Sequence, residues 1–318
     1  MNLDSVACAT RGYPFKVWGF GESIAMEALL AAGGDHASFA ADLLGNWAAA
    51  VSPLRCDPLA HVAPGVPLLQ LHAQRPAPIL LERALELAAV LANTTVGRHA
   101  ARIHRPDLHG WEHAVWVDCM HLDGPFLTLL SACTGDRGWA ELGGVLLLSH
   151  ARILQDERSG LFAHGFDDQA GRANGVHWGR GQGWALLGLT DTLDHCPNAE
   201  IAQRLAALVA GLADTEANSG AWHTVVDDSK TYIEASVAAF VALGVGRAIK
   251  RAQVPQAYTP LAARALDAMR RGIDTDGRLQ GVSDATPVGH TTADYGRRPC
   301  GVFPWGQGPA LMALLEHA

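Results

Sequence analysis

The residues with the clearest capacity for chemistry stand in H-W-G-R-G-Q-G-W, His177 to Trp184, including Trp178, Arg180 and Trp184. Arginine offers a planar fork that fits a carboxylate with two hydrogen bonds, and tryptophan offers a flat face for a sugar ring. Glycine allows the backbone to turn sharply near a ligand. The segment therefore predicts a turn that binds a flat, anionic, carbohydrate-like ligand. Packing of both tryptophans in the core is the alternative.

The G-x-G-x-G spacing in this segment also resembles nucleotide-binding loops. No β-branched strand precedes it, however, and no acidic residue follows at the dinucleotide spacing. We therefore expect no nucleotide cofactor.

A second candidate is Asp118, in A-V-W-V-D-C-M-H-L-D-G-P-F-L. It precedes a predicted helix, so its carboxyl group could accept hydrogen bonds from the first amides of that helix. Alternatively, burial beside Trp116 would raise the pKa of the carboxyl group and suit it to act as a general acid. The two interpretations are compatible. Asp123 is expected to point away from Asp118 and to have a structural role.

Histidine and aromatic residues on other loops complete the candidate site. His164, in G-L-F-A-H-G-F-D-D, could bond a ligand hydroxyl or carboxylate, or be structural. Trp222 is expected at the rim of a cavity or in the core. Trp18 and Phe20, in V-W-G-F-G-E, have a C-terminal counterpart in F-P-W-G-Q-G-P-A-L. These aromatic–glycine turns would place flat surfaces around the mouth of a barrel.

The loop histidines do not predict a metal site. None of them lies in a recognised metal-binding motif; they are His164, His177 and His223. We therefore expect neither a metal nor another cofactor.

Composition limits the classes of protein that this chain can be. Its 318 residues are 49% hydrophobic and carry a formal net charge of -8, which argues against a nucleic-acid or anionic-membrane partner. There is no apolar run long enough to span a bilayer and no secretory signal pattern at the N-terminus. The six scattered cysteines are interpreted as free, mostly buried thiols of a cytoplasmic protein.

Hydrophobic periodicity favours one all-α domain over residues 1–318. Ala and Leu are abundant, and about ten to twelve helices would have to close on themselves to bury so much apolar surface. The predicted helices are Ser23–Ala32, Ala37–Ala50, Leu80–Ala92, Leu122–Ala132, Ala140–Leu154, Ala185–Leu193, Ile201–Ala213, Tyr232–Lys250, Leu261–Arg271 and Pro309–Glu316.

Taken in order, these motifs resemble glycoside hydrolase family 105 and its relative family 88, the unsaturated uronyl hydrolases. The resemblance rests on V-W-V-D-C-M-H-L-D-G-P-F-L, L-F-A-H-G-F-D, W-G-R-G-Q-G-W-A-L-L-G-L, S-G-A-W-H-T-V-V-D-D and G-Q-G-P-A-L-M-A-L. It implies an (α/α)6 barrel that removes a 4,5-unsaturated uronic acid from a small anionic oligosaccharide by hydrating the double bond. Asp118 matches the family's catalytic aspartate. His164, Arg180, Trp178 and Trp184 match pocket residues.

One segment departs from the family pattern. The family's L-D-H-V-x-P-G reads L-A-H-V-A-P-G here, with Ala60 in place of a second aspartate. Alanine can neither accept a hydrogen bond nor carry charge, so His61 or Asp57 would have to compensate, or the substrate differs, or activity is lost. Gln182 also replaces the asparagine of the G-N-G turn, which is a milder change.

Other functions stay open at this point. An inverting glycosidase acting on saturated sugars would pair Asp118 with a base such as Asp57, Glu22 or Asp228. A catalytically inactive sugar-binding barrel would follow from Ala60, and a sugar epimerase is a further possibility. We expect a monomer or a homodimer in any of these cases.

Overall fold

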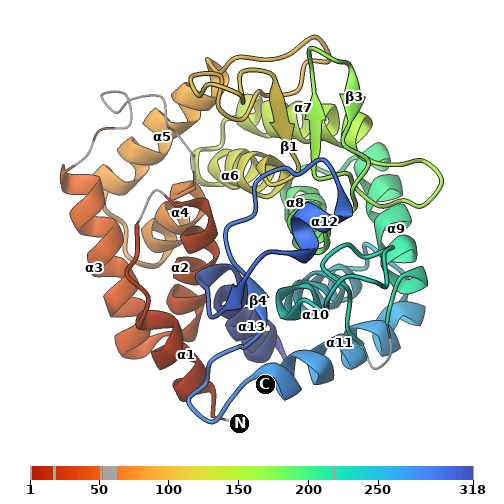
Figure 1. Cartoon of the computed structure of the whole chain (residues 1–318). Coiled ribbons are helices and arrows are strands. Elements are labelled where there is room, and N and C mark those ends of the chain that lie inside the picture. The colour runs from red at the N-terminus through yellow and green to blue at the C-terminus, as the bar shows by residue number, and fades with distance from the viewer. Residues whose placement is uncertain (1, 17–18, 51, 53–62, 218–219, 318) are drawn as a thin grey trace.

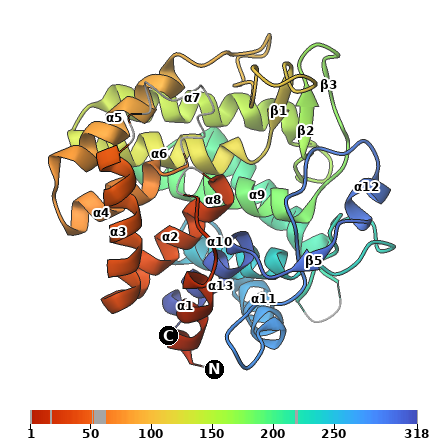
Figure 2. The ribbon, with the colours of Figure 1, turned by 60° about the vertical axis from the view of Figure 1, so that its left-hand side comes forward.

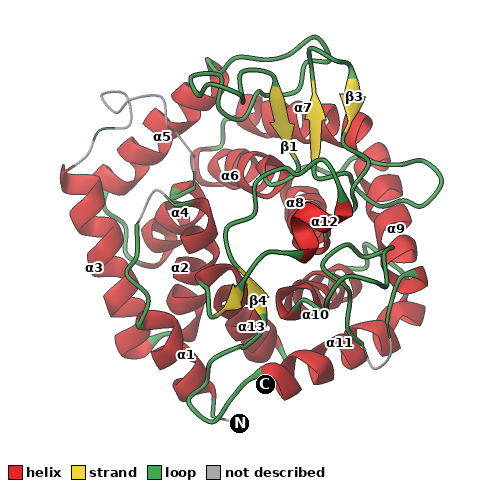
Figure 3. Cartoon of the chain, in the orientation of Figure 1, coloured by secondary structure: helices red, strands yellow, loops and turns green. Residues whose placement is uncertain are grey.

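The computed structural model describes residues 2–16, 19–50, 52, 63–217 and 220–317, without the side chain of Phe20. Helices dominate this part of the chain (Figure 3). The α-helices are α1 (Leu3–Arg11), α2 (Phe20–Ala32), α3 (Gly34–Ala50), α4 (Gly65–Gln74), α5 (Pro78–Ala92), α6 (Cys119–Thr134), α7 (Arg137–Leu154), α8 (Gly179–His195), α9 (Ala199–Asp214), α10 (Ala235–Lys250), α11 (Thr259–Gly272), α12 (Thr292–Gly296) and α13 (Pro304–Glu316).

Six of these helices form a closed inner ring. Successive contacts join α2 to α4, α4 to α6, α6 to α8, α8 to α10, α10 to α13 and α13 back to α2. Outside them pack α1, α3, α5, α7, α9 and α11, as Figures 1 and 2 show. Each inner helix packs against the outer helix that follows it in the chain, and α13 packs against α1. The expected (α/α)6 barrel is confirmed.

An inner and an outer helix illustrate two patterns of burial. The inner helix α10 buries an unbroken run from Ser236 to Val245, because neighbours cover it on several sides. The outer helix α11 buries one stripe (Leu261, Ala262, Ala265, Leu266 and Met269) at the helical period. The inner helix α10 is thus buried on all its faces, whereas the outer helix α11 is buried along one stripe.

Two small sheets lie where the inner helices begin. Strands β1 (Ala114–Trp116), β2 (Gly165–Asp167) and β3 (Arg172–Ala173) pair in antiparallel order, with Trp116 opposite Gly165. Strands β4 (Val282–Ser283) and β5 (Cys300–Gly301) form the second sheet. The pairing of β1 with β2 connects the start of α6 to the loop before α8, so it fixes the site described below.

The structure corrects three expectations. The glycine-rich segment Gly179–Gly183 is not a turn but the first part of α8, and α13 likewise begins at Pro304. Helices α1, α4 and α12 were not predicted. Of the five cysteines that the structure describes, only Cys119 is buried, so the thiols are not mostly buried.

Within the described residues, no helix combines the length and the apolar character needed to cross a membrane.

Candidate active site

A cavity of about 710 Å³ opens at the end of the barrel where the inner helices begin. Its walls come from the loop before α2, the segment before β1, the starts of α6 and α8, and the loop after β4. The lining residues are Tyr13, Lys16, Gly19, Gly21, Glu22, His104, Arg105, Leu108, Trp111, Trp116, Asp118, Trp178, Arg180, Trp184, Ala285, Thr286, Pro287 and Trp305. The cavity therefore combines indole faces with cations and two carboxyl groups.

Asp118 reaches this cavity from the end of β1. It occupies the N-cap position of α6, but its backbone is helical (φ -56°, ψ -33°) and its side chain accepts no capping hydrogen bond. The capping interpretation is therefore wrong. The side chain is 2% exposed, and Oδ2 is buried without a hydrogen-bond partner. This carboxyl oxygen is available to a ligand.

Strand pairing places His164 beside Asp118. The backbone NH of Val117 donates to the carbonyl oxygen of His164 at 3.0 Å, which continues the β1–β2 ladder by one residue. The His164 Nε2 atom then lies 3.4 Å from Asp118 Oδ2. His164 is fully buried, and burial lowers the pKa of its imidazole, while Asp118 opposes this shift. The imidazole is therefore neutral at pH 7.

The hydrogen bonds of Tyr295 determine which nitrogen of this neutral ring carries the proton. The Tyr295 hydroxyl oxygen accepts hydrogen bonds from Asn174 Nδ2 at 3.1 Å and from the Gly289 NH at 3.0 Å. Its own proton is then left for His164 Nδ1, which lies 2.8 Å away. Because Nδ1 accepts this bond, Nε2 carries the hydrogen and directs it toward Asp118.

Arg180 lies in the first turn of α8 and is 2% exposed. Its Nη1 atom donates to the carbonyl and the hydroxyl of Ser283 at 3.0 and 2.6 Å and lies 3.4 Å from Glu234 Oε1. Its Nη2 atom donates to the Asp284 carbonyl at 2.8 Å and to Thr286 Oγ1 at 3.2 Å. Both terminal nitrogens are thus engaged by the protein. The expected free fork for a ligand carboxylate is absent in this conformation, but the positive charge remains at the cavity.

Aromatic rings frame these groups. The Arg180 guanidinium lies 4.5 Å from the ring of Trp178 and 5.6 Å from that of Trp305. Trp178 also packs 4.2 Å from the ring of His164. Trp184 lines the cavity and stacks on His121 at 5.2 Å. Trp305 belongs to the aromatic–glycine segment that was expected at the mouth.

The other predicted binding residues do not join this cavity in the described structure. Trp222 is fully buried, and its indole NH donates to the Leu212 carbonyl at 2.9 Å, so it is a core residue and not a rim residue. Trp18 and His61, like Ala60 and Asp57, lie outside the described residues. Phe20 begins α2, but its side chain is not described.

The structure also shows where three of the named acidic residues lie relative to the cavity. Asp123 forms a bidentate ion pair with buried Arg102, with both distances 2.7 Å, so its structural role is confirmed. Glu22 lines the cavity in the first turn of α2, and burial raises the pKa of its carboxyl group. Asp228 does not line the cavity.

Several cavity residues were not predicted from the sequence. His104 stacks on Trp116 at 4.3 Å, and Trp111 packs against Trp116 at 4.5 Å. Lys16 and Arg105 add positive charge. A signal existed in R-I-H-R-P-D-L-H-G-W, where histidine and tryptophan alternate with arginine just before β1. Tyr295 had no local signal, since it reaches His164 from a distant segment.

Comparisons with known proteins agree with this fold. The chain is 28% identical over 269 residues to the unsaturated rhamnogalacturonyl hydrolase YesR of Bacillus subtilis, covering 80% of this chain and 75% of that protein. A possible member of family GH105 from Salmonella enterica has the same fold, with a TM-score of 0.89, 21% identity, and coverage of 99% and 92%. The unsaturated glucuronyl hydrolase of Bacillus sp. GL1 gives a TM-score of 0.76 at 16% identity, with coverage of 98% and 94%.

The family model of Glycosyl Hydrolase Family 88 matches residues 33–318, which include the cavity residues from His104 to Trp305. The expected family relationship is confirmed. The chain belongs to glycosyl hydrolase family 88 and is a glycoside hydrolase.

Proposed function

We propose that the protein removes a 4,5-unsaturated uronic acid from the non-reducing end of an oligosaccharide by hydrating its vinyl ether double bond. The observation that carries this proposal is the buried, unpartnered Asp118 Oδ2 beside His164 in a cavity with indole walls. Similarity to a named unsaturated rhamnogalacturonyl hydrolase supports the substrate class and favours it over saturated sugars or binding without turnover.

Asp118 acts first as an acid. Its proton adds to C4 of the sugar, and the electron pair of the double bond forms the new C–H bond. The positive charge that develops at C5 is shared with the ring oxygen. Water then adds at C5 and gives its proton to the Asp118 carboxylate, which regenerates the acid. The resulting hemiketal opens by breaking the bond between C5 and the ring oxygen, which leaves a ketone at C5 and a hemiacetal at C1. The hemiacetal then breaks its bond from C1 to the neighbouring sugar, whose oxygen takes up the hemiacetal proton as C1 becomes an aldehyde.

His164 supports this cycle without exchanging a proton. Its Nε2–H faces the Asp118 carboxylate at 3.4 Å, so it stabilises the anion that exists between the two proton transfers. The Tyr295 hydroxyl keeps the ring in this tautomer. His164 is thus proposed as a positioning residue for Asp118.

The cavity suits an anionic ring although the whole chain is acidic. Three cations line it, Lys16, Arg105 and Arg180, together with two carboxyl groups, Glu22 and Asp118. Asp107 pairs with Arg105 at 2.7 Å and Glu234 lies 3.4 Å from Arg180, so part of the positive charge is compensated. Arg180 contributes its positive charge but not a free pair of N–H donors, because both terminal nitrogens already donate hydrogen bonds within the protein. Indole faces supply flat surfaces for the sugar. Trp178, Trp184 and Trp305 are the described residues proposed to contact it, and Trp18, Phe20 and His61 stay predictions.

The test follows the ultraviolet absorbance of the conjugated double bond during incubation with lyase-made disaccharides from pectin, rhamnogalacturonan and glycosaminoglycans. We expect the wild type and Asp228→Asn to remove the absorbance, because Asp228 does not line the cavity. Asp118→Asn should lose it about 10² to 10⁴-fold more slowly. Stable absorbance with the wild type on all three substrates would overturn the proposal.

A cytoplasmic location and a monomeric or homodimeric state stay predictions that accompany this function.

A further inference from the structure

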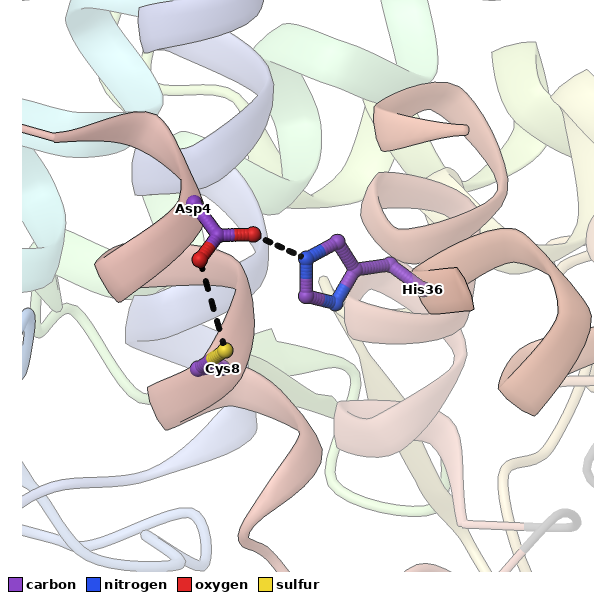
Figure 4. A group of neighbouring side chains, drawn as sticks. All are labelled: Asp4, Cys8 and His36. Atoms are coloured by element: carbon purple, nitrogen blue, oxygen red, sulfur yellow. Dashed lines mark hydrogen bonds and ion pairs between the residues drawn. The ribbon is translucent and has the colours of Figure 1, made fainter. Parts of the chain in front are cut away.

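A cluster of three different donor atoms lies on the outer ring of helices. Asp4 and Cys8 stand one turn apart on α1, and His36 lies in the first turn of the neighbouring helix α3 (Figure 4). Asp4 Oδ1 lies 3.0 Å from His36 Nε2, and Asp4 Oδ2 lies 3.9 Å from Cys8 Sγ. All three residues offer donor atoms within 4.8 Å of one another.

The order of these contacts argues against a cysteine nucleophile. A nucleophilic thiol needs the histidine as its direct neighbour, with the carboxylate behind the ring. Here the carboxylate lies between the sulfur and the imidazole, with one oxygen toward each. The same order suits a cation, because sulfur, nitrogen and oxygen surround one point.

The cluster is accessible but partly fixed. The Asp4 side chain is 70% exposed, whereas that of His36 is 12% exposed. His36 Nδ1 is buried without a hydrogen-bond partner, so the packing of the ring leaves Nε2 as the nitrogen that faces Asp4. The side chain of Asn2 caps α1, since its Oδ1 accepts a hydrogen bond from the Asp4 NH at 3.1 Å, so the first turn that carries Asp4 is ordered.

A second group of possible metal ligands provides a contrast. Cys119, Asp123 and His150 also gather within 4.8 Å and are all buried. There, both oxygens of Asp123 accept hydrogen bonds from Arg102 at 2.7 Å. A guanidinium cation already occupies the place that a metal would take. Among the described residues, no arginine or lysine is paired with Asp4; its partner is His36.

We propose that Asp4, Cys8 and His36 bind a zinc ion. A thiolate, an imidazole nitrogen and a carboxylate oxygen are the ligand types that zinc prefers, and three protein ligands leave a fourth position for water. The Cys8 thiol loses its proton to solvent on binding, and no electron is transferred. The ion joins the first outer helix to the second. The proposed site lies on α1 and α3 and includes none of the residues that line the catalytic cavity.

This site is separate from the family's common features. Asp4 and Cys8 precede residues 33–318, the part of the chain that the family model matches. The zinc ion is therefore expected to affect the stability of the helix pair and to leave the turnover of substrate unchanged.

The test uses the metal-free full chain titrated with Co²⁺ as a spectroscopic probe and then with Zn²⁺. We expect a near-ultraviolet band from sulfur-to-cobalt charge transfer and visible bands of a tetrahedral site, all removed by one equivalent of Zn²⁺. Cys8→Ser should lose the charge-transfer band. Cys133→Ser, which changes another exposed thiol, should keep it.

Thermal unfolding gives an independent measurement. Zinc at about one hundred times its Kd should raise the unfolding midpoint of the wild type by roughly 5 °C, and that of His36→Gln by none. The variants must unfold like the wild type without metal, which excludes a folding defect. A charge-transfer band that persists in Cys8→Ser, or its absence from the wild type, would overturn the site.

Discussion

Two buried carboxyl–histidine pairs lie along the inner helices, and they have opposite surroundings. At the mouth, Asp118 Oδ2 lies 3.4 Å from His164 Nε2, beside a cavity of about 710 Å³. Further along the helices, Glu27 Oε1 lies 3.8 Å from His121 Nε2, beside a cavity of about 170 Å³. We call these the upper pair (Asp118 and His164) and the deeper pair (Glu27 and His121). Trp184 lies between them, because it lines the cavity at the mouth and stacks on His121.

The deeper pair is enclosed by ion pairs. Arg247 bonds Asp191 at 3.0 Å and Glu316 at 2.7 Å, and Arg251 bonds Asp191 at 2.7 Å. Burial, assisted by the negative charge of Asp191, raises the pKa of Glu27 to about 8. Burial lowers the pKa of His121 to about 4. Both members are therefore neutral near pH 6.

A buried carboxyl–histidine pair does not by itself define an active site. The upper pair adjoins indole faces and a large opening, with its histidine tautomer fixed by Tyr295. The deeper pair adjoins a small cavity and a fixed charge network. The two pairs differ in the size of the cavity through which a substrate could reach them.

The largest expected difference is in turnover. Asp118→Asn should lower kcat about 10² to 10⁴-fold, since the proton donor is lost while no capping bond is broken. Glu27→Gln should keep kcat within about threefold, because Gln replaces a carboxyl group that is neutral at pH 6. Steady-state kinetics at pH 6 on the unsaturated disaccharide would measure both. Equal losses in the two variants would remove the distinction.

The next largest effect is on stability, through the ion pairs of Arg247 around the deeper pair. Arg247→Met should lower the free energy of unfolding by about 2 to 3 kcal/mol, because it leaves the partly buried Asp191 with Arg251 as its remaining partner. Urea unfolding measures this change. The matched control is Arg152→Met, whose ion pair with Glu200 is exposed and should cost less than about 1 kcal/mol. A small loss for Arg247→Met would show that the network does not enclose the deeper pair.

The deeper pair should also make stability depend on pH. A carboxyl group with a raised pKa binds more protons in the folded state, so stability falls as pH rises between about 4.5 and 8. His121 has the opposite effect between about 4 and 6.5. The two cancel up to about pH 6.5, and Glu27 alone then costs about 2 kcal/mol by pH 8.

Urea unfolding of the wild type and of Glu27→Gln at several pH values isolates this contribution. The difference between their unfolding free energies should change by about 2 kcal/mol from pH 6.5 to 8, with the wild type losing stability. A constant difference across that range would mean that Glu27 does not hold a proton in the folded protein.

The sequence predicted the scaffold better than the chemistry around it. Ten helices followed from apolar periodicity, because burial against neighbouring helices imposes that period on each segment separately. The Gly179–Gly183 segment was misread because three glycines usually disfavour a helix. In the barrel they allow close packing: a Cβ on Gly183 would lie 2.3 Å from the ring of Phe240. That contact is invisible in local sequence.

Sequence motifs identified five residues that reach one region of the structure: Asp118, His164, Trp178, Arg180 and Trp184. Motifs did not identify the residues that hold these side chains by hydrogen bonds. Glu234 and Ser283 hold Arg180 from positions 54 and 103 residues away, and Tyr295 meets His164 from 131 residues away. Only the closed ring brings such segments together, so long-range hydrogen bonds could not be predicted from local patterns.

Tyr295→Phe should give the smallest of these effects and the most direct view of the upper pair. Without the hydroxyl, His164 Nδ1 loses its hydrogen bond and the ring can adopt the other tautomer, in which Nε2 no longer carries the hydrogen that faces Asp118. We expect kcat/KM to fall about tenfold, equivalent to about 1.4 kcal/mol, and its pH profile to shift. Tyr258→Phe, on the outer ring, is the control. An unchanged pH profile would mean that Tyr295 only packs against His164, and that the proton on Nε2 does not depend on it.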